Sequence, residues 1–312
     1  MSRYLERAEH TVRLLDVNLN LMLDEGENTN GRRWTRVLHA LGNPKGLDWE
    51  GDAYGLARAL MFDEDNAASI ICCISSARDN ARQVREQISS EQWQRLNSLY
   101  HELTQQTQDM AQDVQLSDFL QAAMEGVHLF QGVTDSTMGH GEGWHFIQLG
   151  RYLERASATA RLLNVYPAEF WQHGERTRAS TDYLEWIGLL RSCTAFEAYC
   201  RVYTADVSPD RILEFLLLDD EFPHAVRYSV DALQTALSAI HRSGGGIRRC
   251  EGLMRLAGRL QAQLSFAEVQ EIATQDVVEY LRGISQQLQH VNGEIFHQYF
   301  DYPIVAALAA SS

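Results

Sequence analysis

Proline is scarce in this chain, with five residues among 312, so few helix breaks are expected. The five cysteines form no Cys-x-x-Cys pair and share no regular spacing, which argues against a disulfide framework and against a zinc ribbon. No apolar run reaches the roughly 18 residues that a membrane-spanning helix needs. The N-terminal stretch MSRYLERAEHTV carries charges where a secretory signal peptide needs apolar residues. These absences predict a reduced, cytoplasmic protein that is not embedded in a membrane.

Basic residues are also few relative to acidic ones. Lysine and arginine together number 27 against 42 for aspartate and glutamate, which gives a formal net charge of −15 at pH 7. Proteins that coat nucleic acid or lie on anionic membranes normally present a basic face, and this composition does not supply one. Hydrophobic residues make up 45% of the chain, which is ordinary for a globular protein. We therefore expect a folded body with no nucleic-acid and no membrane partner.

Runs with the alternating period of a β-strand are absent, whereas apolar residues recur at helical spacing along almost the whole chain. The first segment shows this spacing most clearly, at Leu5, Ala8, Val12, Leu15, Leu19 and Met22. Further on, Ser208-Pro209-Asp210 has the residue order that opens a helix. Ser265 and Glu268 fit a capping box that opens a long helix towards Phe300. We predict an all-α protein of about ten helices.

One segment occurs twice. Residues Arg3-Tyr-Leu-Glu-Arg-Ala8 return unchanged as Arg151-Tyr-Leu-Glu-Arg-Ala156, 148 positions later. Five more residues return at the same offset, since Thr11, Arg13, Leu14, Leu15 and Val17 match Thr159, Arg161, Leu162, Leu163 and Val165. Trp34 and Trp186 match at an offset of 152, as short insertions between two copies would produce. The repeat predicts a duplicated helical bundle whose pseudo-symmetric halves, residues 1–140 and 141–312 of about 150 residues each, pack as one body.

The first copy of this segment has a second apolar stripe, formed by Leu14, Val17 and Leu21, on a different side from the main one. A helix that is apolar on two sides is packed on two sides and is therefore central. Charged side chains on such a helix are expensive to bury unless they pair. We therefore expect a glutamate–arginine network between the two copies, formed by Glu6, Arg7, Arg13, Glu154, Arg155 and Arg161.

Two interpretations of this network stay open. The pairs can orient the two central helices and do no chemistry. Alternatively, the arginines can bind the carboxylate or phosphate of another molecule at the interface between the two copies. Plain surface salt bridges are a third interpretation, but the return of the same charges in both copies argues against it.

A second basic cluster consists of Arg78, Arg82 and Arg85, whose spacing of four and three residues places them on one side of a helix. Such a ridge on an acidic protein can dock an acidic partner surface. It can also be a solvated helix face moderated by Asp79 and Glu86. We take the three arginines as the candidate docking site for a partner.

Motifs typical of a metalloprotein or of a common enzyme class are missing. His140, Glu142 and His145 lie close in sequence but lack the spacing of a standard metal site. The glycine-rich segment 243–249 lacks the Lys-Ser/Thr ending of a phosphate-binding loop and is interpreted as a flexible connection. No Gly-x-Ser-x-Gly motif occurs. The sequence predicts no metal, no cofactor and no recognisable catalytic set.

The repeated segment, Tyr-Leu-Glu-Arg-Ala followed by Thr or Ser and by Arg-Leu-Leu, resembles the glutamate–arginine motif of the bacterial Alpha-E family. Three more blocks resemble the same family in the same order: Asn66–Arg82, Ser90–Trp93 and Phe215–Pro223. The resemblance implies a helical domain whose genes and fusions accompany circularly permuted ATP-grasp proteins, transglutaminase-like proteins and sometimes a proteasome-like peptidase. Such a set of proteins forms or trims amide bonds on peptides.

Two functional hypotheses follow. In the first, the chain is a non-catalytic helical scaffold that binds an ATP-grasp or transglutaminase-like partner in amide-bond formation or modification. In the second, it is an enzyme or half-site whose paired glutamate–arginine motifs bind a substrate bearing a carboxylate or phosphate. A homodimer whose interface supplies the function is a third alternative. The solvent exposure of the repeated charges distinguishes the first two hypotheses. If these charges pair with one another away from solvent, the enzyme hypothesis has no substrate-binding site.

Overall fold

The computed structural model describes residues 1–24, 27–109, 116–166, 171, 180–204, 206–243 and 251–299. Within these residues the chain forms fourteen α-helices and no β-strand. The predicted all-α class is confirmed. The predicted number of about ten helices is wrong, because periodicity alone does not separate short helices from their connections. Within the same residues, no helix has both the length and the apolar character that crossing a membrane requires.

Six of the α-helices in the described residues precede residue 140. They are α1 (Ser2–Asp24), α2 (Glu27–Ala40), α3 (Ala53–Phe62), α4 (Ile70–Gln83), α5 (Ser90–Asp109) and α6 (Leu116–Thr137), with the 3-10 turn η1 (Arg85–Gln87) after α4. The later helices are α7 (Glu142–Asn164), α8 (Ser180–Ser192), α9 (Phe196–Tyr203), α10 (Pro209–Leu213), α11 (Val226–Ser243), α12 (Glu251–Ser265), α13 (Val269–Thr274) and α14 (Val277–Tyr299), with the π-helical segment η3 (Glu214–Leu218) after α10.

The first residues of the later helices show which of the predicted helix starts occur in the structure. Pro209 is the first residue of α10 and Ser208 its N-cap, as predicted. The predicted capping box at Ser265 is wrong, because Ser265 ends α12 and a long helix begins only with α14. The Asp276 carboxylate provides the actual start signal, since it accepts the backbone N–H groups of the first turn of α14 at 3.0 and 3.2 Å. The glycine-rich segment falls outside the described residues after position 243, and so does Phe300.

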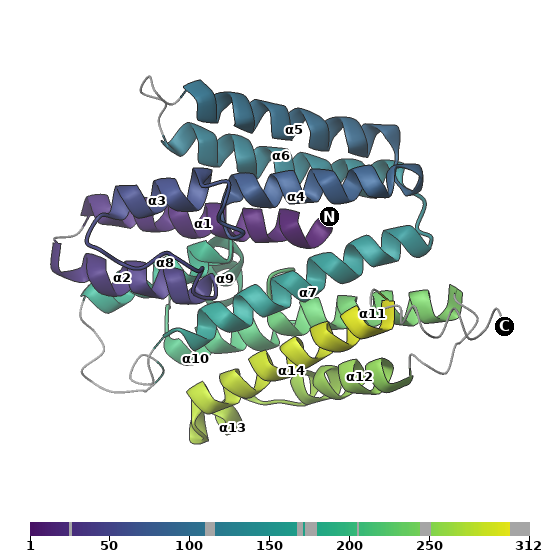
Figure 1. The fold of residues 1–312 in the computed structure, drawn as a ribbon. Coiled ribbons are helices and arrows are strands. Elements are labelled where there is room, and N and C mark those ends of the chain that lie inside the picture. The colour runs from purple at the N-terminus through teal and green to yellow at the C-terminus, as the bar shows by residue number, and fades with distance from the viewer. Residues whose placement is uncertain are drawn as a thin grey trace.

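Helices α1 and α7 lie next to each other in the middle of the molecule (Figure 1). Helix α1 packs on α4 and α6, and α7 packs on α11 and α14. The two halves also exchange contacts, because α2 packs on α7 and α8 packs on α1. Both copies of the repeated segment are therefore enclosed by other helices. This is the central position that the two apolar stripes predicted.

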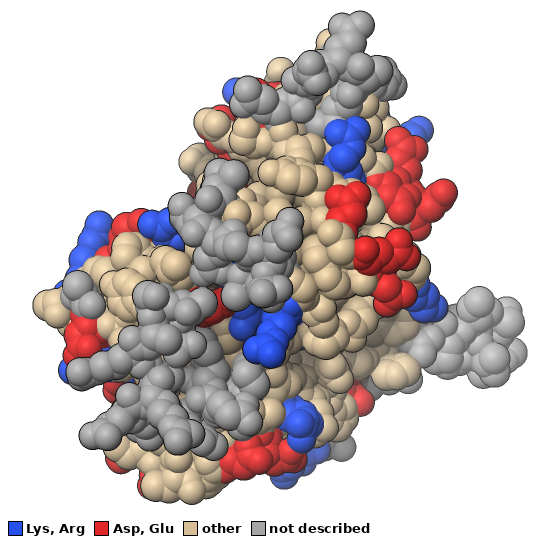
Figure 2. All heavy atoms as spheres, turned by 90° about the vertical axis from the view of Figure 1, so that its left-hand side faces the viewer, with Lys and Arg blue, Asp and Glu red and all other residues tan. Residues whose placement is uncertain are grey.

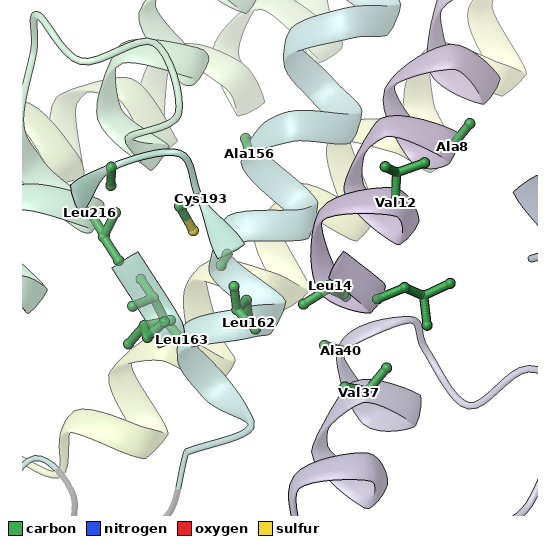
Figure 3. Close-up of a cluster of buried hydrophobic side chains, with 14 of the residues drawn as sticks. Ala8, Val12, Leu14, Val37, Ala40, Ala156, Leu162, Leu163, Cys193 and Leu216 are labelled. Carbon is green, nitrogen blue, oxygen red and sulfur yellow. The ribbon is translucent and has the colours of Figure 1, made fainter. Parts of the chain in front are cut away.

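The main hydrophobic core continues across the contact between these two helices. Figure 3 shows side chains of α1, α2 and α7 in one cluster, including Val12, Leu14, Val37, Leu162 and Leu163, all of them buried. The matched tryptophans Trp34 and Trp186 are buried in the same core. Charged groups on α1 and α7 must therefore be satisfied within this apolar surrounding.

Candidate functional site

The repeated charges meet where α1 crosses α7. Glu6 pairs with Arg155, and Arg7 pairs with Glu154, so the same two residues of each copy bind each other in reciprocal order. A close approach of the two helices makes this possible. A Cβ atom at Gly150, one turn before Glu154, would lie 2.5 Å from the Ser2 hydroxyl and 3.2 Å from Arg3 Cγ of α1, so a larger residue would require these side chains to shift.

The Glu6–Arg155 pair is sealed from solvent. Arg155 Nε and Nη2 donate to the two carboxylate oxygens of Glu6, at 2.5 and 3.0 Å, in the forked geometry of a bidentate pair. Only 2% of the Glu6 side chain and 7% of the Arg155 side chain are exposed. Burial lowers the pKa of Arg155, but Glu6, together with the nearby Glu9 and Tyr152, raises it above its usual value. Burial raises the pKa of Glu6, and Arg155 opposes that rise.

A second buried carboxylate, Glu9, lies one turn further along α1. Arg13 Nη2 lies 3.0 Å from Glu9 Oε1, and Gln131 of α6 donates to Glu9 Oε2 at 3.1 Å. His128 of α6 lies 3.2 Å from Glu9 Oε1. Burial opposes ionisation of Glu9, yet the charge of Arg13, the hydrogen bond with His128 and the charge of Arg155 hold its pKa far below the usual range. Arg13 therefore pairs with Glu9. The sequence pattern places Arg13 with Glu6 and does not single out Glu9.

Two histidines lie near this carboxylate, the half-buried His224 and the buried His10. His224 Nε2 lies 3.2 Å from Arg13 Nη1, and burial together with Arg13 holds the pKa of His224 well below its usual value. His10 is buried on α1, and its Nε2 atom has no hydrogen-bond partner in the described part of the chain. Burial and the positive charge of Arg13 lower the pKa of His10 to about 3. Both imidazoles are therefore neutral in the folded protein at pH 7.

The Arg7–Glu154 pair differs because it reaches the surface. Arg7 donates to Glu154 Oε1 at 3.0 Å, and Arg3 donates to Glu154 Oε2 at 3.0 Å. The Glu154 side chain is 10% exposed, but those of Arg7 and Arg3 are 35% and 40% exposed. Arg3 also donates to Asn292 of α14 at 2.8 Å. Sequence reasoning missed Arg3 as a site residue, although it is the first residue of the repeated segment.

Arg161, the last predicted residue of the network, has no carboxylate partner in the described residues. Its Nη1 atom donates to the Ala40 carbonyl at the end of α2, at 3.3 Å. Burial lowers the pKa of Arg161, although Glu154 opposes this. The equivalent residue in the first copy, Arg13, has Glu9 four residues before it, whereas the second copy has Ser157 at that place. The structure therefore joins four of the six predicted residues in reciprocal pairs and places Arg13 and Arg161 apart from them.

The local charge differs between the buried surroundings of Glu6 and Arg155, called the sealed side, and the solvent-accessible surroundings of Arg7 and Glu154, called the open side. On the sealed side, Arg155 and Arg13 face the two carboxylates of Glu6 and Glu9. On the open side, Arg3 and Arg7 share Glu154, and Arg161 lies near the same carboxylate without forming an ion pair with it. The open side therefore has an excess of positive charge on a protein whose net charge is −15. An anionic group such as a carboxylate or phosphate is the chemistry that this excess can bind.

The three arginines predicted to dock a partner do not share one helix. Helix α4 ends at Gln83, so Arg85 lies in the turn η1, and the predicted single ridge is wrong in this respect. Arg78 and Arg85 nevertheless both lie over the ring of the half-buried Trp93, at 5.9 and 5.8 Å from its centroid. Arg82 is exposed. These arginines thus form one basic surface across α4 and η1.

A charged group on α2 and α8 was not predicted. Arg33 Nη2 lies 3.0 Å from Glu185 Oε1, and Arg36 pairs with the other carboxylate oxygen of Glu185. These residues and Asn18 line a cavity of about 20 Å³, which has room for a single water molecule. A sequence signal existed, since Arg33 and Glu185 each precede one of the matched tryptophans by one position.

The histidines considered as metal donors both pack on one tryptophan. The ring of His140 stacks on that of Trp144 at 4.1 Å between centroids, and the ring of His145 contacts Trp144 edge-on at 5.1 Å. In the residues for which the structure gives positions, no three His, Cys, Asp or Glu side chains gather as a metal site would require. On the face shown in Figure 2, acidic side chains gather over one broad area, whereas basic side chains stand in small groups.

Comparison with known proteins identifies relatives over nearly the whole chain. Residues 1–300 match Alpha-E, described as a predicted alpha-helical domain with a conserved ER motif. An uncharacterised protein of Mycobacterium bovis and one of Mycobacterium tuberculosis (strain CDC 1551) are each 25% identical over 315 residues, covering 93% of this chain and 35% of the relative. The chain thus spans about a third of the length of these curated relatives. No solved structure matches it significantly.

Proposed function

The chain belongs to the Alpha-E family, and from this premise we propose that it is a non-catalytic helical scaffold that acts with an ATP-grasp or transglutaminase-like partner in forming or modifying amide bonds of peptides. The observation that carries the proposal is the mutual pairing of the repeated charges. Both oxygens of Glu6 and both oxygens of Glu154 receive guanidinium donors. This pairing disfavours either glutamate as a general base.

The length of the relatives supports a role beside other domains. About two thirds of each mycobacterial relative lies outside the match, so in those proteins the helical domain is joined to more polypeptide. A domain that occurs in this way is suited to positioning a neighbour. We place the protein in the cytoplasm, where a nucleotide-dependent amide ligase has its ATP.

The second part of the proposal is that the two halves arose by internal duplication. The repeated segment forms α1 and α7, and each of these packs on helices of its own half, α1 mainly on α4 and α6, and α7 mainly on α11 and α14. The reciprocal pairs Glu6–Arg155 and Arg7–Glu154 are what a pseudo-two-fold axis between two copies would generate. This origin supports a scaffold, because duplication gives two central helices that brace each other.

Co-purification from the native cell tests the scaffold. A tagged chain is expected to recover an ATP-grasp or transglutaminase-like protein in stoichiometric amount, and sedimentation of the purified mixture is expected to show one complex. Sedimentation of the chain alone tests the homodimer. A mixture that sediments as separate components at micromolar concentrations would contradict the proposal.

Matched charge reversals then test the docking surface. The double variant Arg82→Glu/Arg85→Glu is expected to weaken the complex at least tenfold, because it replaces the basic surface of α4 and η1 by an acidic one. Arg255→Glu/Arg259→Glu makes the same charge change on two exposed residues of α12 and is expected to leave the complex intact. Equal weakening by both doubles would mean that only the net charge matters.

A specific observation also favours the second candidate, an anion-binding half-site. The excess positive charge around Glu154 includes two guanidinium groups that solvent can reach. Titration calorimetry with inorganic phosphate is expected to show binding that Arg7→Gln weakens. If phosphate binds the two proteins equally, the open side is not an anion site.

A further inference from the structure

The chain has a single lysine, Lys45, since all its other strongly basic residues are arginines. It lies in the connection between α2 and α3, a part of the molecule that neither the paired charges nor the docking surface includes. A pocket of about 300 Å³ lies beside it, between residues 43–49 and the last turns of α2. This volume is at the lower end of the range of about 300–1,000 Å³ found for ligand sites, and it fits a molecule of amino-acid size.

The backbone around the pocket is fixed by specific turns. Gly42 N–H donates to the His39 carbonyl at 3.0 Å and Asn43 N–H to the Leu38 carbonyl at 2.9 Å, a pair of bonds that forms a Schellman motif at the end of α2. The motif needs a left-handed residue, and Gly42 has a φ of +85°. A hydrogen bond of 3.3 Å from Leu47 N–H to the Pro44 carbonyl closes the next turn. Lys45 therefore projects from a defined turn.

One wall of the pocket is apolar and held in place. Trp49 lies parallel to the buried Trp34, with 6.2 Å between ring centroids and 2° between ring planes. Its Nε1 atom lies against α2 at Gly31, where a Cβ atom would come within 3.2 Å. Leu38 and Leu47 continue this wall. The wall suits an apolar or aromatic group of a ligand.

The rim carries both signs of charge. Lys45 and Asp48 are exposed, and so is the His39 imidazole. In the described part of the chain, none of these three side chains forms a hydrogen bond or an ion pair. The end of α2 needs none of them, because its last carbonyl already accepts a hydrogen bond from Arg161. A cation, an anion and an apolar wall therefore surround one small pocket.

We propose that this pocket binds a free α-amino acid with an apolar side chain. Its carboxylate binds the Lys45 ammonium beside His39, its ammonium group binds the Asp48 carboxylate, and its side chain packs on Trp49. A molecule with only one of the two charges leaves the other rim group unpaired and is held less tightly. The inference is independent of the proposed scaffold, since the pocket shares no residue with the docking surface.

Calorimetric titration with three related probes tests the assignment. L-Phenylalanine has both charges, N-acetyl-L-phenylalanine lacks the ammonium, and L-phenylalaninamide lacks the carboxylate. Free phenylalanine is expected to bind at least tenfold more tightly than either derivative at 150 mM salt. The net charge of −15 alone would favour the cationic amide, so a preference for the zwitterion has to come from the pocket. No binding of phenylalanine at millimolar concentration, or tighter binding of the amide, would overturn the proposal.

Two variants assign each charge. Lys45→Ala is expected to bring phenylalanine down to the affinity of the amide, and Asp48→Asn to that of the acetylated probe. Arg255→Ala and Asp118→Asn make the same charge changes at exposed residues of α12 and α6 and are expected to change nothing. If the controls weaken binding as much as the pocket variants do, the pocket is not the site.

A spectroscopic measurement locates the ligand directly. Reductive methylation with ¹³C-formaldehyde keeps the charge and gives one lysine side-chain NMR signal, since Lys45 is the only lysine. Addition of phenylalanine is expected to move this signal and to leave the signal of the N-terminal amine in place. Movement of neither signal while calorimetry shows binding would place the ligand elsewhere and refute the proposal.

Discussion

The same charges occur twice in this molecule and lie in different surroundings. The Glu6–Arg155 pair is buried between α1 and α7, whereas Glu154 is shared by two arginines that solvent reaches. The sealed side also contains Glu9, which the second copy replaces by Ser157. Identical motif residues therefore hold the helices together on one side and leave an excess of positive charge on the other. Repetition of a motif does not imply repetition of its role.

The largest effect is expected at the sealed pair. Glu6→Ala leaves the buried Arg155 guanidinium without its carboxylate, which is expected to lower the free energy of unfolding by about 3–5 kcal/mol. Urea denaturation should show a lower midpoint with an unchanged slope. Glu279→Ala removes a carboxylate from an exposed pair with Arg282 and provides the control, with a change of less than about 0.5 kcal/mol. A wild-type midpoint for Glu6→Ala would show that the pair does not stabilise the fold.

The pH dependence of stability distinguishes the sealed side in a second way. The pKa of His10 falls from 6.5 to about 3 on folding, so the unfolded chain binds a proton between these pH values and the folded chain does not. The contribution of neutral His10 to stability is complete above pH 6.5 and is lost as the pH falls towards 3. Between pH 6.5 and pH 4, wild-type protein is expected to lose about 3 kcal/mol more than His10→Gln, as measured by urea denaturation at both pH values. Equal losses would mean that His10 is protonated in the folded state.

Glu154→Ala is expected to have a smaller effect than Glu6→Ala. Its partners Arg3 and Arg7 remain in contact with water when the carboxylate is removed, so the expected loss is about 1–2 kcal/mol. The two variants should be compared in the same urea experiment. If Glu154→Ala is as destabilising as Glu6→Ala, the exposure of the arginines does not set the difference between the two sides.

The smallest change supplies the carboxylate that the second copy lacks. Ser157→Glu places an acid four residues before Arg161, as Glu9 is placed before Arg13. The new pair is expected to stabilise the protein by about 0.3–0.5 kcal/mol and to weaken phosphate binding on the open side. Ser157→Gln is the neutral control. Unchanged stability together with unchanged phosphate binding would show that Arg161 does not respond to a local carboxylate.

The fold class and the central helices were predictable because they follow from local spacing. The two apolar stripes of residues 5–22 are a property of one helix, and they correctly indicated a helix packed on several sides. The prediction that a long helix starts at Ser265 is wrong because a competing start signal, Asp276, lies close to it in the sequence. Asp276 was as visible in the sequence as Ser265, but only the packing decides which of them caps a helix.

The partners of the charged residues were harder to predict. Reciprocal pairing of Glu6 with Arg155 follows from the repeat, because both lie on central helices. The donors around Glu9 come from α6, and no pattern within α1 indicates which helix covers that face. Arg78 and Arg85 likewise lie on an aromatic ring of another helix. Contacts between segments far apart in the chain depend on the tertiary fold, which the spacing of residues does not contain.

The pairing of Glu6 with Arg155 also bears on synthesis, because these residues are 149 positions apart. At ribosomal speeds of about 5–20 residues per second, roughly 7–30 s pass between the synthesis of Glu6 and that of Arg155. During that interval the apolar stripe and the charges that later meet α7 stay without their partners. We therefore expect the nascent first half to be recognised by chaperones, and pausing of translation before residue 164 would prolong its exposure.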